Sequence, residues 1–287
     1  MPAYLIDITD CGPRDEHEAS TEHPARLIVG VAGIGAWTRG APDWPSLRAL
    51  LRGEAEWRED APVRPAASIL PPGERRRAPD SVLLAAEIAG QACAAAGRDA
   101  ASLPCVFAST HGELAITDYM CATLASAPHE LSPTKFHNSV HNAPAGYWTI
   151  AAQCTACSSA VTGHRSSFGA GLLEAAVLAI ADDTPVLFAA YDIASSGPLA
   201  EMTRTTRAFG AALVLVPGGG PLPRLSIATR DPGAPVAAAP GCVSDLANDN
   251  PLNAHALAFL NALSGDGGTR LTLPAASGLM LDMEIHP

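Results

Sequence analysis

Two histidines and two cysteines stand at spacings that could hold a metal ion. His137 and His141 form an H-x3-H pair, and Cys154 and Cys157 follow as a C-x2-C pair. Imidazole nitrogens and thiolates at such spacings are typical zinc ligands. One hypothesis is therefore a zinc-stabilised scaffold in which the four side chains converge. The intervening segment Tyr147–Ile150 is typical of a core, however, and the sequence favours a chain without a bound metal.

A nucleophilic cysteine is the second possible chemistry. Cys157 could act with His141 or His111 as the cysteine–histidine pair of an acyltransferase or hydrolase. This hypothesis predicts an exposed Cys157 thiol with a low pKa, which a helix N-terminus or a nearby histidine promotes. The strongest predicted helix in this region begins near Ser166, and no cysteine stands there.

The composition indicates a folded protein with a large core. Of 287 residues, 48% are hydrophobic and 16% charged, and 18 Lys+Arg against 29 Asp+Glu give a net charge of −11. That charge argues against a protein that coats nucleic acid. The apolar runs are too short to cross a bilayer, the N-terminus does not resemble a signal peptide, and seven cysteines suit reduced thiols. We therefore expect a cytoplasmic protein with no membrane span.

Apolar runs bounded by glycine, proline or charged residues predict the elements that position these groups. Strands are predicted at 27–35, 103–108, 158–162, 185–191, 208–216, 224–229, 270–273 and 279–285, and helices at 44–51, 79–96, 115–125, 166–181 and 253–263. Loops are predicted at 54–78, 126–146 and 231–250. Because strands and helices alternate, we expect an α/β fold, a layered sheet flanked by helices on both faces.

Two local patterns need a separate interpretation. Gly33-Ile34-Gly35 follows a predicted strand, but a dinucleotide-binding loop would need a third glycine where Thr38 stands, so a tight turn is expected. His111 and Glu113 follow another strand, and we expect them to be structural hydrogen-bonding groups.

Segments in a fixed order resemble the β-ketoacyl-ACP synthases. Ser132–Gly146 resembles the loop of that family that ends in Asn-x-x-Ala-Gly, and segments 27–35, 44–53 and 208–216 resemble its first strand, its Trp-containing helix and its Gly-Ala-Leu-Val-Leu strand. The resemblance implies a thiolase-like fold with a mixed sheet. It implies an N-terminal arm at 1–26, a ketosynthase-like domain at 27–230, and a truncated C-terminal half at 231–287 holding one helix and a strand pair.

The same resemblance places the catalytic cysteine at the N-terminus of a buried helix, where the helix dipole favours a thiolate. Counting without gaps from Gly146, that position falls on Arg165, flanked by His164 and Ser166. An arginine cannot form a thioester and stays protonated. His255 reads as part of an ordinary amphipathic helix, so the catalytic histidines of the family also have no match. The resemblance thus implies no catalytic residue and no cofactor in this chain.

The chain is most similar to the chain-length-factor-like proteins of aryl polyene and other polyene-pigment type II polyketide systems. Segments 72–79, 107–118 and 168–174 carry this resemblance. It implies a heterodimer with an active β-ketoacyl-ACP synthase, with an acyl carrier protein as an indirect partner. The strand expected to pair with the partner consists of Ser158, Ser159, Ala160, Val161 and Thr162. The residues expected near the partner's acyl tunnel are Phe136, His137, Asn138, Val140, His141 and Asn142.

Overall fold

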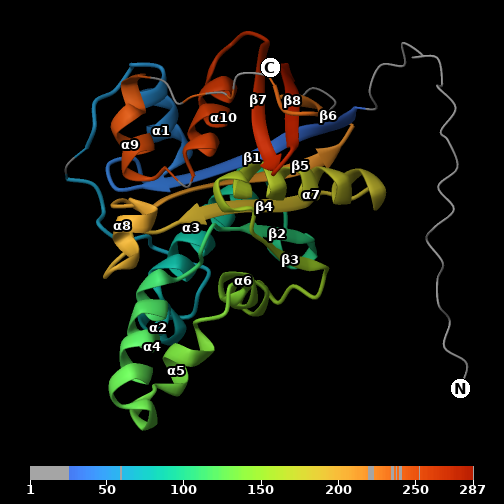
Figure 1. Cartoon of the computed structure of the whole chain (residues 1–287). Coiled ribbons are helices and arrows are strands. Elements are labelled where there is room, and N and C mark those ends of the chain that lie inside the picture. Colours follow the sequence, from blue (N-terminus) through green and yellow to red (C-terminus); the bar gives the residue numbers. More distant parts are fainter. Residues whose placement is uncertain are drawn as a thin grey trace, which may run out of the picture.

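The computed structural model describes residues 26–58, 60–218, 223–233, 236, 238, 241–251 and 253–286. The expected N-terminal arm, 1–26, lies outside these ranges except for Arg26. Within them, one mixed eight-stranded sheet has the order β3-β2-β4-β5-β1-β6-β8-β7 (Figure 1). The strands are β1 Leu27–Thr38, β2 Cys105–Ala108, β3 Ser158–Val161, β4 Val186–Asp192, β5 Phe209–Pro217, β6 Arg224–Arg230, β7 Thr269–Ala276 and β8 Leu279–His286. The strands β3, β2 and β4 run parallel, and the other pairings are antiparallel.

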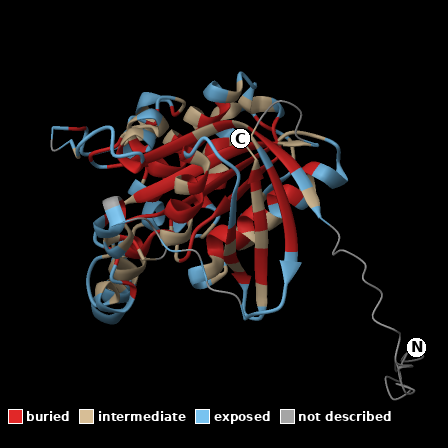
Figure 2. Cartoon of the chain, turned by 90° about the horizontal axis from the view of Figure 1, so that it is seen from above, coloured by how far each residue is buried: buried red, intermediate tan, exposed pale blue. Residues whose placement is uncertain are grey.

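Helices cover both faces of this sheet, as predicted. The helices are α1 Trp44–Leu51, α2 Pro72–Arg77, α3 Asp80–Ala96, α4 Leu114–Ser126, α5 Pro133–His137, α6 Ala143–Ala152, α7 Ser167–Ala181, α8 Leu199–Thr203, α9 Ser244–Asp249 and α10 Ala254–Ser264. Leu187 of β4 belongs to the apolar cluster that includes α3, and Phe188 belongs to the cluster that includes α7. Successive strand residues point to opposite faces, so α3 and α7 lie on opposite sides of the sheet. Buried residues fill the centre of the molecule (Figure 2).

The Gly-Ile-Gly segment lies inside β1, and the tight turn expected there was wrong. A β-carbon added to Gly35 would lie 2.1 Å from the carbonyl oxygen of Ile88, and one added to Gly33 would lie 2.3 Å from that of Ala92. Both acceptors belong to α3. The two glycines therefore allow the α3 backbone to pack directly on β1, a close approach that a side chain would prevent.

The helix α7 is enclosed on two sides. It packs on β2 and β4 and also contacts β7, which stands with β8 above it in Figure 1. A β-carbon on Gly169 would lie 2.1 Å from the carbonyl oxygen of Pro274, and one on Gly171 would lie 2.5 Å from the Phe188 ring. The small residues at the start of α7 are therefore required by neighbours on both sides.

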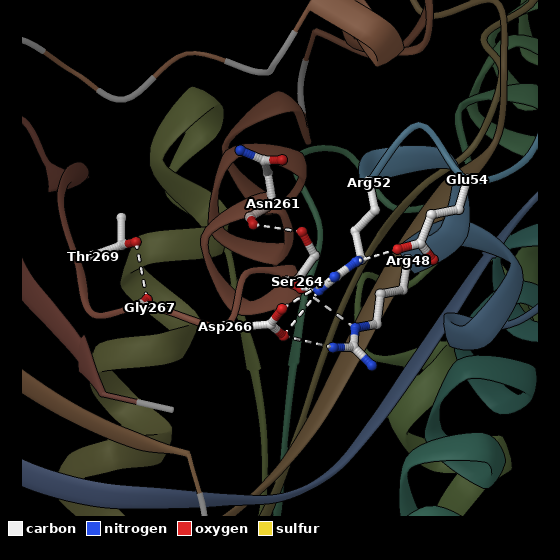
Figure 3. A network of polar contacts seen from close by, with 8 residues as sticks. All are labelled: Arg48, Arg52, Glu54, Asn261, Ser264, Asp266, Gly267 and Thr269. Atoms are coloured by element: carbon white, nitrogen blue, oxygen red, sulfur yellow. Dashed lines mark hydrogen bonds and ion pairs between the residues drawn. The ribbon is translucent and has the colours of Figure 1, made fainter.

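A group of charged side chains ties α1 to the end of α10 (Figure 3). Arg48 Nε and Arg52 Nη1 donate to the carbonyl oxygen of Ser264, at 3.4 and 3.0 Å. Arg52 also pairs with Asp266, at 2.9 Å, and with Glu54. Cations that hydrogen-bond the last carbonyls of a helix stabilise its C-terminus, so α1 caps and holds α10.

The predicted loops contain short helices: α2 within 54–78, α5 and the start of α6 within 126–146, and α9 within 231–250. Pro72, Pro133 and Pro144 each stand in a first helical turn. A proline there costs no hydrogen bond and sets a helical backbone angle, although the same residue also signals a loop. The division at residues 26 and 230 stays a prediction. Among the described helices, none has the length and apolar character to cross a membrane.

Candidate functional site

Polar residues gather at the edge of the sheet where three parallel strands end. Ser109, Thr110 and His111 follow β2, the turn 163–166 follows β3, and Asp192 is the last residue of β4. The carboxyl ends of parallel strands are where α/β proteins commonly build sites. This edge is therefore the candidate site.

Asp192 is the buried anchor of this edge. Its carboxylate accepts hydrogen bonds from Ser109 Oγ at 3.0 Å, from the Thr110 backbone N–H at 2.9 Å and from the Thr110 hydroxyl at 3.1 Å. Burial raises the pKa of Asp192 to about 6, and the hydrogen bonds limit the rise. Asp192 thus fixes the segment after β2. This role was not predicted from the sequence, although an aspartate at the end of an apolar run is a visible signal.

The turn between β3 and α7 holds one residue in an unusual backbone conformation. His164 has a φ of 53°, in the left-handed region that non-glycine residues rarely adopt. Its carbonyl oxygen accepts from Ser167 Oγ at 2.7 Å and lies 3.2 Å from Thr110 Oγ1. Ser167 Oγ in turn accepts from the Gly163 N–H at 3.0 Å. Strained strand-to-helix turns of this kind present a side chain at the top of a sheet.

Three histidines approach one another beside this turn. The rings of His111 and His164 meet edge to face, with centroids 6.0 Å apart. His141 Nε2 lies 2.9 Å from the carbonyl oxygen of Ser109. Burial, followed by the neighbouring His164 and His141, lowers the pKa of His111. His111 is therefore held uncharged at neutral pH and can exchange hydrogen bonds without carrying charge.

Glu113 behaves as the sequence analysis expected. Its carboxylate is buried and accepts from the Ser81 backbone N–H at 3.1 Å. Ser81 stands in the first turn of α3, where a free N–H favours an acceptor. Burial raises the pKa of Glu113, and the hydrogen bonds from Ser81 partly oppose this rise. Glu113 joins the start of α4 to the start of α3 and has a structural role.

His255 lies in the predicted helix, α10, but it makes a contact that the sequence did not predict. Its Nδ1 lies 3.0 Å from the carbonyl oxygen of Arg165, so α10 brings a histidine to the turn from the far end of the chain. A carbonyl oxygen only accepts, so Nδ1 carries the hydrogen. Burial lowers the pKa of His255, which keeps the ring neutral with Nε2 unprotonated. No local sequence signal could have shown this contact.

Cys157 lies at the opposite end of β3 from the histidines. The register pairs Cys105 with Ser158 and Ala108 with Val161, so Cys157 precedes the first rung and His164 follows the last. A four-residue strand spans about 13 Å. The pairing of Cys157 with His141 or His111 is therefore wrong, because both histidines lie at the carboxyl end.

The four residues of the zinc hypothesis are also kept apart. Cys154 Sγ donates to the carbonyl oxygen of Leu103 at 3.4 Å, before β2 begins, whereas His141 contacts Ser109 after β2 ends. Over the described part of the chain, no group of three or more His, Cys, Asp or Glu side chains is placed to hold a metal ion. The zinc-scaffold hypothesis is therefore wrong.

A groove of about 880 Å³ lies between α2, α5 and α6. Of the residues predicted near an acyl tunnel, His137, Val140 and Asn142 line it, and Phe136 and Val140 are 58% and 51% exposed. Asn138 is instead buried and accepts from the Tyr147 hydroxyl at 3.1 Å. His141, as described, contacts the carbonyl oxygen of Ser109. The structure thus presents four of these six residues at the surface or in the groove and directs two inward.

The strand β3 forms one end of the described sheet and is hydrogen-bonded to β2 alone. Thr162 lies just past the strand and donates through Oγ1 to the carbonyl oxygen of Thr110, at 3.0 Å. The helices beside β3 expose apolar side chains, with Ile150 of α6 80% exposed and Val177 and Ile180 of α7 45% and 38% exposed. An open edge flanked by apolar side chains favours association with another chain.

A family model described as β-ketoacyl synthase, N-terminal domain, matches residues 51–273. The chain belongs to this family. The comparison with curated protein sequences returned no match.

Three solved structures extend the comparison. A chain from a ketosynthase in complex with its chain length factor, from Xenorhabdus doucetiae, is 23% identical with a TM-score of 0.68, covering 90% of this chain and 99% of that one. The ishigamide ketosynthase/chain length factor gives 15% identity and a TM-score of 0.60, with 90% and 99% covered. A β-ketoacyl synthase from Burkholderia phymatum is 14% identical with a TM-score of 0.56, and the match covers 82% of this chain and 71% of that chain. These similarities establish the thiolase-like ketosynthase fold that the sequence predicted.

In this β-ketoacyl synthase domain, the predicted nucleophile position lies in the turn before α7. The three residues there, His164, Arg165 and Ser166, form a short 3-10 turn and include no thiol. Arg165 is exposed, and its guanidinium has no hydrogen bond or ion pair within the described residues. Of the three, only His164 has the strained backbone. The match of Arg165 to the nucleophile stays a prediction.

Proposed function

We propose that this chain is a non-catalytic, chain-length-factor-like subunit that pairs with an active β-ketoacyl-ACP synthase. The reaction would be the elongation of polyene-type acyl chains, of the aryl polyene class, in the cytoplasm. The observation that carries the proposal is the turn before α7, which presents His164 and Arg165 where a family nucleophile is expected.

The chemistry of this turn supports a role without catalysis. A thioester intermediate needs a thiolate, and the guanidinium of Arg165 remains protonated and cannot take its place. The described thiol nearest to this turn in the sequence, Cys157, lies beyond the other end of β3. The polar network around Asp192 and His164 would then preserve the shape of the turn while the partner supplies the nucleophile.

The open edge of the sheet supports a partner. We expect Ser158, Ser159, Ala160, Val161 and the adjoining Thr162 to pair with the corresponding strand of the ketosynthase, so that one sheet continues through both chains. Ile150 and Val177 would be buried at that contact. Among the structural neighbours, one is described as a ketosynthase in complex with its chain length factor.

The groove between α2, α5 and α6 supports a role in limiting the length of the acyl chain. Its lining is mostly apolar, with Val140, Tyr147 and Ile150 beside His137 and Asn142. We expect Phe136 and Val140 to face the acyl tunnel of the partner and to limit the length of the growing chain by steric blocking. An acyl carrier protein would bind mainly to the partner, because this chain carries a net charge of −11.

The test is co-expression with the ketosynthase encoded beside this chain, followed by mass determination in solution and an elongation assay with malonyl-carrier protein. We expect a 1:1 complex that elongates, with acyl groups on the partner's cysteine alone, and an Arg165→Ala complex that elongates equally well.

Ile150→Glu should weaken the complex at least ~10-fold, since it places a charge in an apolar contact. Met202→Glu is the matched control, because Met202 is also exposed, at 60%, but lies on α8. Acylation of this chain's own cysteine, or equal effects of the two glutamate variants, would overturn the proposal.

A further inference from the structure

Four cysteines from three segments lie at the amino-terminal ends of β2 and β3, away from the turn before α7. Cys105 is the first residue of β2, Cys93 lies on α3, and Cys154 and Cys157 lie between α6 and β3. The Cys105 thiol lies close enough to the other three for their charges to act on it. Cys93, Cys105 and Cys154 are buried, and Cys157 is exposed. The cluster therefore has one member that solvent reaches directly.

Cys154 and Cys157 are both held against one short stretch of chain. Cys154 Sγ donates to the carbonyl oxygen of Leu103, at 3.4 Å, and the Cys105 backbone N–H donates to the carbonyl oxygen of Cys157, at 2.9 Å. The chain bends at Ala156, between the two cysteines. A disulfide needs α-carbons about 4–7 Å apart, and a bend within a C-x2-C segment shortens that separation. Both cysteines are thus anchored to residues 103–105, on either side of the bend.

The exposure of the thiols gives them different reactivities. Burial raises the pKa of both Cys93 and Cys105 to about 12, so these two stay protonated at neutral pH. The exposed thiol of Cys157 can meet a dissolved reagent first. Cys154 stands three positions earlier in the chain and is the cysteine nearest to Cys157 in the sequence. It is therefore the thiol expected to react next with an oxidised Cys157.

We propose that Cys154 and Cys157 form a reversible disulfide by exchange with a small-molecule disulfide of the glutathione type. The Cys157 thiolate attacks one sulfur of the oxidant, forming a mixed disulfide and releasing one glutathione thiolate. The Cys154 thiolate then attacks Sγ of Cys157, forming the internal bond and releasing the second. Two protein thiols are oxidised, one disulfide is reduced to two thiols, and the two protons pass to the released thiolates.

This modification site does not depend on the proposed partner role. The bond would join the end of α6 to the residue before β3, because Cys157 precedes the first residue of that strand. It would therefore restrain the segment that leads into the open edge, without touching the residues around Asp192.

The experiment incubates the reduced full chain with mixtures of reduced and oxidised glutathione, followed by acid quenching, alkylation and trypsin. Cleavage after Lys135 and Arg165 yields a peptide, 136–165, whose only cysteines are Cys154 and Cys157. In the wild-type chain this peptide should become lighter by two hydrogen atoms and should escape alkylation. Cys154→Ser should stop at the mixed disulfide, so that the peptide carries one glutathione.

Two further variants complete the test. Cys157→Ser should abolish both products, since the attacking thiol is gone. In Cys154→Ser, the serine hydroxyl can still donate to the carbonyl oxygen of Leu103. Cys121→Ser is the matched control, because Cys121 is also exposed but lies on α4, and it should react as the wild type does. The proposal is overturned if wild type and Cys154→Ser carry the same glutathione adduct. It is equally overturned if peptide 136–165 is found linked to another peptide.

Discussion

A side chain on Gly169 would collide with the carbonyl oxygen of Pro274, which lies 2.1 Å from the position of the missing β-carbon. This contact places the first turn of α7 directly against β7. The strained turn at His164 is built on that end of the helix, so the C-terminal strands fix the geometry of a site whose other parts come from the middle of the chain.

Gly169→Ala should therefore destabilise the fold. Overpacking a tight contact costs about 1–3 kcal/mol, and the gain in helix propensity of up to about 1 kcal/mol does not offset a collision with backbone. Urea unfolding should show a net loss of about 2 kcal/mol. Gly90→Ala is the matched control, because Gly90 lies within α3 and a β-carbon there meets nothing within 4 Å. An equal gain in stability for both variants would contradict the close contact.

We expect the side chain of Asn250 to contribute strongly to the stability of the fold. Its buried Nδ2 donates to the carbonyl oxygens of Asp192 and Arg207, both at 2.9 Å, and Oδ1 accepts from the Asn253 N–H at 3.1 Å. Asn250→Ala removes the donor to the carbonyl oxygens of Asp192 and Arg207, and each buried unsatisfied group costs about 1–3 kcal/mol. We expect a loss of about 3 kcal/mol in chemical denaturation. The exposed Asn248, also near the end of α9, should change stability by less than about 0.5 kcal/mol when mutated to alanine.

Asp192 should make stability depend on pH. Burial raises its folded pKa to about 6 from 3.8, so between these values the unfolded state has already lost the proton that the folded state keeps. The free energy of unfolding should then fall by about 3 kcal/mol as the pH rises from about 4 to about 6, and stay level above. Asp192→Asn should flatten this part of the pH profile in urea titrations, whatever its stability at pH 7. Asp183→Asn is the control, because Asp183 is exposed, and it should keep the fall in stability between pH 4 and 6. If that fall persists in Asp192→Asn, another group causes it.

His255 should be neutral at pH 7 with its hydrogen on Nδ1. The contact with the Arg165 carbonyl oxygen requires that tautomer, and burial lowers the pKa of the ring. Long-range nitrogen–proton NMR of labelled protein distinguishes the two tautomers. Arg165→Ala keeps the carbonyl and should leave the His255 signals in the same tautomeric state. A hydrogen on Nε2 would show that the contact is not made in solution.

The sequence predicted the long elements well and their contacts poorly. Helices α3 and α7 were predicted nearly to their ends, because each has a long apolar run and Gly97 stops the first. Gly33 and Gly35 were misread as a turn, since a glycine pair signals either a turn or close packing and only the position of α3 decides. Short helices that begin with proline were read as loops for a similar reason.

The site was predicted in part. The start of a helix just after residues 164–166 was predicted from the sequence, and the structural role of Glu113 followed from its place after a strand. The contacts of Asp192 and His255 join residues that are 82 and 90 positions from their partners in the chain. Contacts of that range leave no periodic signal in the sequence, so the topology of the sheet was needed to find them.

The position of β1 in the sheet has a consequence for how the protein is made. Its neighbours are β5 and β6, with Val29 opposite Pro217 and Leu27 opposite Ile227, so β1 pairs with strands that are synthesised much later. At roughly 5–20 residues per second, β1 waits about 10–40 s for these partners. During that interval α1 can cover Val29 and Val31, and α3 can cover Trp37 on the other face. The glycines that let α3 approach β1 also allow this early cover to form.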